Sequence, residues 1–277
     1  MQQASPALFW LAIRQDCRSL LTVPLLTVAP SVGNKHGQVE SELPVKKDLS
    51  LIGLGLYSVA EAAALTRVEA PKIRRWLCGH AIGEKSYPAL WKSQLEKFEM
   101  EQLYLSFLDL VQLRVSKAFI DAGLSPQKVR RAIEYGSQIV SSDYPFASAR
   151  FRTDGKTVVL HVLKNDGGED HLIDLFSSGQ YLMQKVIEPS LKNLEFDEAD
   201  TAARWWPLGR SKGVVIDPQR QFGQPIDDAT GVPTSVLAEA VQAEGSEAQA
   251  ARRLMVPVAS VHRAVAFEQL LSQQLAA

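Results

Sequence analysis

The sequence predicts a mainly α-helical protein with small β-hairpins, organised around two helix-turn-helix units. The first observation behind this prediction is a pair of short helix patterns near residues 56–80, the second of which is basic. The second observation is a comparable helical pair near the end of the chain, and the third is Gly-containing turns between β-rich runs. A length of 277 residues, 46% of them hydrophobic and 22% charged, fits two or three globular domains.

Shifts in composition along the chain predict four regions. Residues 1–49 form a flexible N-terminal tail, and residues 50–140 contain the first helix-turn-helix unit. Residues 141–204 are a middle segment that contains a β-hairpin, and residues 205–277 are a C-terminal helical domain. The net charge is −1, but it combines a slight basic excess in the second region with an acidic excess in the two that follow. This asymmetry suggests different partners for the two halves.

The N-terminal tail and the cysteines argue for the cytoplasm and against a membrane. The apolar stretches Ala7–Ile13 and Leu20–Val28 are separated by charged residues, and neither approaches the roughly 18 residues of a membrane span. No basic residue precedes the first stretch, as a signal peptide would require. Cys17 and Cys78 form no CxxC pair, so they indicate neither a disulfide framework nor a zinc site and fit a reducing compartment.

The first helix-turn-helix pattern begins at Leu56. Ser58 and Glu61 have the spacing of a capping box at the head of a short Ala-rich helix, Val59–Leu65. A second helix follows with Pro71 in its first turn, where the missing N–H is tolerated. Its apolar face is Ile73, Trp76 and Leu77, and its outer side carries Lys72, Arg74 and Arg75. This arrangement suits a reader of the DNA major groove, although a helical hairpin with solvated charges inside a larger core has the same pattern.

The residues that follow favour the DNA-binding interpretation. Gly83–Pro88 predicts a small wing, and Leu105–Phe119 a long amphipathic helix. Gly123–Pro126 ends that helix and caps the next one, Gln127–Ile139. The buried side of this last helix is predicted to consist of Val129, Ala132, Ile133 and Gly136.

Residues 56–136 resemble the MerR family of winged helix-turn-helix regulators. The order of parts that carries the resemblance is YSVAEAAALTRV, IRRWL, GEKSYP and LSFLDLVQLRVSKAFIDAGLSPQKVRRAI. The resemblance implies contacts of Arg74 and of the wing residue Lys85 with the DNA backbone. The candidate DNA-binding residues are Ser58, Lys72, Arg74, Arg75 and Lys85. Arg67 stands where the family usually has Gly in the inter-helix turn, and a non-Gly residue at positive φ costs about 1 kcal/mol, so we expect an opened or altered turn.

The middle segment predicts a hairpin. Arg150–Arg152 and Thr157–Val162 flank Thr153–Lys156, which contains the Asp-Gly pair typical of a tight turn. The acidic loop Asn165–Asp170 follows, and Leu172–Phe176 fits either a third strand or a helix. A solvated loop is preferred over a cation site because the spacing of its acidic residues fits no EF-hand; they are Asp166, Glu169, Asp170 and Asp174.

The C-terminal region predicts two short strands and three helices. GVVIDPQRQFGQPI indicates a strand, a turn at Asp217-Pro218 and a second extended piece. Thr234 or Ser235 caps a helix that runs to Glu244 and is closed by Gly245, and a capping box of Ser246 and Gln249 starts the next, Glu247–Leu254. The last helix covers Ala259–Leu271, with Val261, Val265 and Phe267 facing inward and His262 and Arg263 facing elsewhere. The pattern fits a second helix-turn-helix and a dimerisation bundle equally well.

Residues 213–267 resemble the small antitoxin domain, formerly of unknown function, that accompanies PIN-type toxins in bacteria. The resemblance rests on VVIDPQRQFGQPI, GVPTSVLAEAVQAEGS and the closing helical pair; Asp228–Gly231 and Pro257 depart from the family pattern. As a whole, the chain resembles a long VapB-type antitoxin. That resemblance implies a cytoplasmic, prokaryotic homodimer that binds a PIN-like ribonuclease toxin and represses its own operon by binding the operator DNA.

Signals for an enzyme are missing from the sequence. It has no Gly-rich phosphate loop, no G-x-S-x-G and no HExxH, and its five histidines lack ligand spacing, so no catalytic residue, cofactor or metal is predicted. Trp205-Trp206 suits core packing better than base stacking. The alternatives are a stand-alone MerR-like transcription regulator whose middle region senses a ligand, and an interaction adaptor that does not bind DNA.

Overall fold

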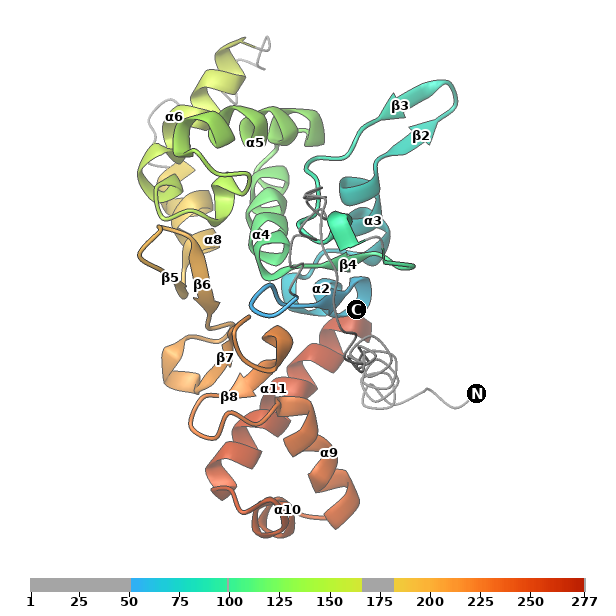
Figure 1. The fold of residues 1–277 in the computed structure, drawn as a ribbon, viewed down its shortest axis with the longest axis vertical. Coiled ribbons are helices and arrows are strands. Elements are labelled where there is room, and N and C mark those ends of the chain that lie inside the picture. Colours follow the sequence, from blue (N-terminus) through green and yellow to red (C-terminus); the bar gives the residue numbers. More distant parts are fainter. Residues whose placement is uncertain (1–50, 99, 166–181, 277) are drawn as a thin grey trace, which may run out of the picture. The chain divides into compact units, whose positions relative to one another are not determined.

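The computed structural model describes residues 51–98, 100–165 and 182–276. The chain divides after Ser50, and residues 51–277 form one compact unit. The predicted tail, the strand or helix at Leu172–Phe176 and the four acidic residues considered for a cation lie outside the described residues. The described part is mainly helical, with small antiparallel sheets of two and four strands (Figure 1).

The first helical pair forms largely as the sequence predicts. Helix α2 spans Val59–Thr66 and α3 spans Ala70–Cys78, with a proline in the first turn of α3. Strand β1, Tyr57–Ser58, pairs antiparallel with β4, Tyr104–Leu105, so it joins the start of α2 to the segment before the next long helix. Trp76 and its two predicted apolar neighbours on α3 are buried, as expected.

Two long helices pack behind this pair. Helix α4 spans Phe107–Asp121 and α5 spans Pro126–Val140, each two residues or fewer from its predicted start and end. Ser125 caps α5 through its side chain, as the sequence indicated, and Ser106 caps α4 in a full capping box with Asp109. The predicted buried face of α5 is confirmed at all four positions. The short 3₁₀ turns η1, Glu96–Phe98, and η2, Pro145–Ala147, flank these helices.

The predicted hairpin around Thr153–Lys156 is wrong, because residues Phe151–Asn165 form helix α6. Burial at Phe151, Gly155, Val158, Val159 and Val162 recurs with helical spacing, so packing outweighs the strand preference of the β-branched run. A Cβ on Gly155 would lie 2.9 Å from both Ile187 and the Phe151 ring. The glycine therefore allows close packing inside a helix and does not form a turn.

A four-stranded antiparallel sheet in the order β5-β6-β7-β8 follows a π-helical turn, η3 (Leu182–Ile187), and the short helix α8 (Glu188–Leu191). Its strands are Leu194–Phe196, Ala202–Trp205, Val214–Ile216 and Pro225–Asp227. The two strands predicted on either side of Asp217-Pro218 are thus present as β7 and β8, in register Val215 to Ile226. The 3₁₀ turns η4 and η5 occupy Arg210–Lys212 and Gln221–Gly223.

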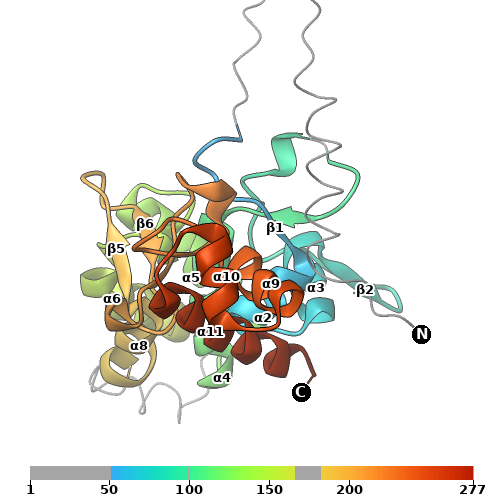
Figure 2. The same cartoon turned by 90° about the horizontal axis from the view of Figure 1, so that it is seen from below.

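Three helices complete the chain: α9 (Thr234–Glu244), α10 (Glu247–Leu254) and α11 (Val258–Ala276). They contact one another around a small core of their own. Figure 2 shows the three helices from below. Gly245 and Ser246 end and cap the helices as predicted. The predicted Thr234 cap is wrong: Pro233 is the N-cap residue of α9, and the Thr234 hydroxyl instead donates to Pro225 O and to Glu268.

The main core runs from Tyr57 to Ile216, so the first helical pair, the long helices and the sheet share one apolar interior. Trp205 and Trp206 are 5% and 4% exposed, which confirms packing and excludes an open stacking platform for bases. Among the described residues, no helix is both long and apolar enough to cross a bilayer.

Candidate nucleic-acid interface

Helix α2 is held by the capping box predicted from the sequence. The Ser58 hydroxyl accepts from Glu61 N at 3.2 Å, and the Glu61 carboxylate accepts from Ser58 N at 2.8 Å and from the Ser58 hydroxyl at 2.7 Å. Ser58 is half-buried, so its side chain is engaged in fixing the helix start. A contact of Ser58 with DNA stays a prediction.

The turn between α2 and α3 keeps its shape although it lacks glycine. Arg67 adopts the left-handed conformation at φ 58° and ψ 34°, and its N–H donates to Ala63 O at 2.8 Å. The expectation of an opened turn is therefore wrong, because the backbone hydrogen bond and the packing of α3 hold a conformation that an L-residue disfavours by about 1 kcal/mol. The residue takes the left-handed position that glycine usually fills.

Helix α3 presents a basic outer face. Lys72, Arg74 and Arg75 are exposed on it while Ile73 and Trp76 are buried, so the charges are displayed by a rigid element. Lys72 forms an ion pair with Glu69 at 2.7 Å. Within the described residues, Arg74 and Arg75 enter no salt bridge. Their charges are therefore available to an anionic partner.

A two-stranded hairpin stands where the wing was predicted. Strands β2, His80–Ile82, and β3, Lys85–Tyr87, pair with Ile82 opposite Lys85, directly after α3 (Figure 1). Gly79 joins the hairpin to α3 at φ 71°, and a Cβ there would lie 2.6 Å from Tyr87 O. Lys85 is exposed, and Ile82 near the tip is 63% exposed. Lys85 thus follows the basic helix on a separate, protruding element.

A pocket of about 740 Å³ brings two of the predicted residues, Lys72 and Arg75, together with basic residues of other helices. Lys117 on α4 and Arg130 on α5 line it as well, whereas Ser58, Arg74 and Lys85 do not. The sequence does not predict Lys117 as part of this surface. Local spacing gives no signal for it, because the proximity arises from the packing of α4 and α5 beside α3.

Basic side chains of two helices act on Glu69, at the edge of this surface. The pKa of Glu69 is lowered, first by the hydrogen bond from Lys72 and its charge, and further by the charges of Arg75 and Lys117. Lys117 also pairs with Asp121 one helical turn further on. Cations from α3 and α4 therefore act on the same carboxylate, which favours an anionic partner here.

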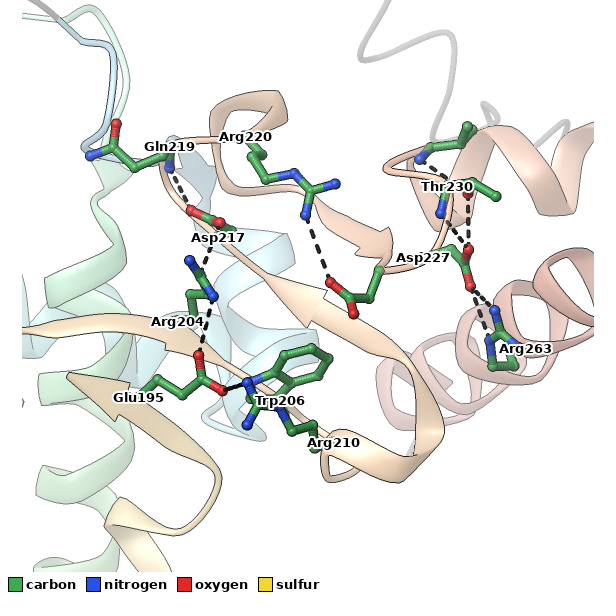
Figure 3. Close-up of polar contacts among 12 residues, drawn as sticks. Glu195, Arg204, Trp206, Arg210, Asp217, Gln219, Arg220, Asp227, Thr230 and Arg263 are labelled. Carbon is green, nitrogen blue, oxygen red and sulfur yellow. Dashed lines mark hydrogen bonds and ion pairs between the residues drawn. The ribbon is translucent and has the colours of Figure 1, made fainter. Parts of the chain in front are cut away.

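The polar residues in and around VVIDPQRQFGQPI make contacts within the fold (Figure 3). Asp217 accepts a hydrogen bond from Gln219 N at 2.9 Å and forms an ion pair with Arg204 at 3.2 Å, and Glu195 accepts from Trp206 Nε1 at 2.9 Å. Asp227 is fully buried and accepts from Thr230 and, at 3.0 Å, from Arg263 Nε. Arg263 thus faces the sheet, which corrects the expectation that it faces elsewhere. These contacts hold β6, β7 and β8 to one another and to α11.

The chain is similar to a distant curated relative and to a solved structure. No protein-family model matches the chain. It is 26% identical, over 204 residues, to the putative antitoxin VapB45 of Mycobacterium tuberculosis (strain ATCC 25618 / H37Rv), covering 70% of this chain and 83% of that protein. The crystal structure of Rv2018 from Mycobacterium tuberculosis is similar with a TM-score of 0.56 at 23% identity, covering 77% of this chain and 98% of that one. The second match supports the mainly helical fold.

Proposed function

We propose that this chain is a DNA-binding antitoxin, without enzymatic activity, that neutralises a PIN-like ribonuclease toxin and represses its own operon. The observation that carries the proposal is the similarity to a VapB-type antitoxin over 70% of the chain. The basic face of α3, with two arginines outside any salt bridge of the described residues, supports the DNA-binding part.

In this proposal, α3 enters the major groove and the hairpin β2–β3 contacts the backbone beside it. Phosphate contacts from Arg74, Arg75, Lys72 and Lys85 supply most of the affinity, because neutralising phosphates releases counterions. A two-fold dimer of the chain matches two half-sites of an operator. The Ser58 cap fixes the start of α2, which packs on α3 and so orients it.

The toxin part is tested by co-expression with the reading frame that neighbours the gene of this chain, followed by affinity purification and a growth assay. A stable complex that relieves the growth arrest supports the antitoxin function. Retained DNA binding without any complex or relief would refute that function and leave the stand-alone transcription regulator.

The DNA part is tested with the chain's own upstream DNA. A duplex of that sequence is titrated by fluorescence anisotropy against a scrambled duplex, at several salt concentrations. Salt-sensitive binding that prefers the upstream sequence supports autorepression. No binding to either duplex at about 0.05 M salt would indicate an interaction adaptor, because electrostatic affinity is largest there.

A further inference from the structure

The pocket beside α3 has the dimensions of a small-molecule site. It lies between α3, the hairpin β2–β3, the end of α4 and the start of α5. Its volume of about 740 Å³ falls in the range of ligand clefts, roughly 300–1,000 Å³. No part of the DNA-binding proposal requires a hollow of this size.

The inner wall of the pocket is apolar and aromatic. It includes Val68, Trp76, Leu90 and Ile120, and the stacked rings of His80 and Tyr87 close one side. The centroids of these two rings lie 4.9 Å apart and their planes differ by 12°. Such a wall favours a flat ring as ligand, since stacked and apolar contacts both stabilise it.

The rim of the pocket is positively charged. Five basic side chains line it against two acidic ones, and each acid, Glu69 and Asp121, is already paired with a lysine. The basic residues are Arg67, Lys72, Arg75, Lys117 and Arg130. Gln127 lies in the first turn of α5, whose N-terminal end adds further positive potential.

Two buried polar atoms of pocket-lining residues lack a hydrogen-bond partner within the described residues. They are His80 Nδ1 and Arg130 Nε, the second of which lies 3.4 Å from Glu134 without forming a hydrogen bond. Both atoms are buried beneath neighbouring protein atoms, and Arg130 is ion-paired with Glu134, so the case for a ligand rests on the basic rim and the apolar wall.

We propose that this pocket binds a small planar anion of the nucleoside-monophosphate type. The ring of the ligand lies against Tyr87 and Trp76, and its phosphate lies near Lys117 and Arg130. A phosphodiester of duplex DNA would meet the basic rim but leave the apolar wall unused, which favours the small ligand. Lys72 and Arg75 belong to both the rim and the DNA-binding face, so the ligand competes with DNA; this consequence rests on the proposed function.

Binding is measured by isothermal titration of the full chain with AMP, and with adenosine and inorganic phosphate as probes that carry one half of the ligand each. We expect AMP to bind more tightly than either half. Lys117→Ala and Arg130→Ala each weaken AMP binding about tenfold, the effect of losing one charge-assisted contact. Lys128→Ala is the matched control, because it removes the same charge from α5 outside the pocket.

Three outcomes would overturn the proposal. The first is that AMP does not bind, and the second is that Lys117→Ala and Arg130→Ala weaken AMP binding no more than Lys128→Ala does. The third is that the two variants weaken binding of duplex DNA while AMP does not bind. This result would mean that the pocket residues contact the DNA phosphate backbone. AMP binding that persists in a chain unable to bind DNA supports the pocket and refutes only the proposed function.

Discussion

The double substitution Arg74→Ala/Arg75→Ala tests the basic face of α3 most directly. Both side chains are exposed, and within the described residues neither takes part in a salt bridge. Their loss is expected to change the free energy of unfolding by less than about 0.5 kcal/mol, as is usual for surface positions. An effect on DNA binding therefore cannot be attributed to unfolding.

The magnitude follows from counterion release. Each phosphate contact contributes about 0.9 to the slope of log K against log salt, so the double variant lowers the slope by about 1.8. If the two proteins bind equally at 1 M salt, this difference in slope makes the double variant bind about 30-fold more weakly than the parent chain at about 0.15 M salt. The loss is the same for the specific and the scrambled duplex when only phosphates are contacted. A larger loss on the upstream sequence would indicate that one arginine reads bases.

The assay is fluorescence anisotropy between about 0.05 and 0.3 M salt, where this slope is measurable. The matched control is Arg252→Ala/Arg253→Ala, an adjacent pair of exposed arginines on α10 in the second helical unit. An unchanged slope in the α3 variant would refute the assignment of α3 to DNA. A reduced slope in the α10 variant alone would place the DNA contact in the C-terminal helices.

Three further predictions concern the contacts that hold the elements together. Tyr57→Phe removes the buried hydrogen bond from the Tyr57 hydroxyl to Gly223 O at 2.7 Å, and we expect a loss of about 1–3 kcal/mol in urea unfolding; an unchanged midpoint would contradict this. Asp227→Ala leaves Arg263 without its buried partner and should cost about 3 kcal/mol, whereas the exposed Asp228→Ala should cost under about 0.5 kcal/mol. Burial raises the pKa of Glu268, so the folded state holds its proton more tightly than the unfolded state and stability falls as the pH rises from the ordinary glutamate range through that raised pKa. Glu268→Gln should flatten this part of a thermal-unfolding pH profile and raise stability at neutral pH; a profile identical to that of the parent chain would show that another group titrates there.

Local signals in the sequence predicted the helices that begin with a cap or end at a glycine. Ser58, Ser125 and Ser246 each cap a helix as expected, because the capping interaction involves residues three positions apart. The hairpin prediction for the middle segment was wrong because the Asp154-Gly155 pair and the β-branched run have a strong local preference for a hairpin. Tertiary packing decides against the hairpin: residues of this segment are buried with helical spacing, and Ile187 and Phe151 pack closely against Gly155.

In the candidate site, too, local features could be predicted from the sequence and features that depend on tertiary packing could not. The basic residues of α3 could be predicted because helical periodicity separates Lys72 and Arg75 from the buried Trp76. The contribution of Lys117 and Arg130 could not, since these residues reach the pocket through the packing of α4 and α5 beside α3. Arg263 was misplaced for a related reason: its buried partner Asp227 lies 36 residues earlier in the chain, on β8.

The motif VVIDPQRQFGQPI, which carries the resemblance to an antitoxin domain, makes structural contacts. A similarity in this motif therefore indicates a shared fold and says little about binding specificity. In VVIDPQRQFGQPI the aspartate orients a turn, and Gly223 is needed because a Cβ would lie 2.2 Å from the Tyr57 hydroxyl. The same hydroxyl bonds Gly223 O, so this loop is joined to the strand that precedes α2. The contacts of Tyr57, Asp217 and Gly223 in this junction are thus structural ones. Under the proposed function, selectivity for an operator or a toxin must then come from exposed positions outside the motif that read base edges or contact the toxin, because phosphate contacts carry no sequence information.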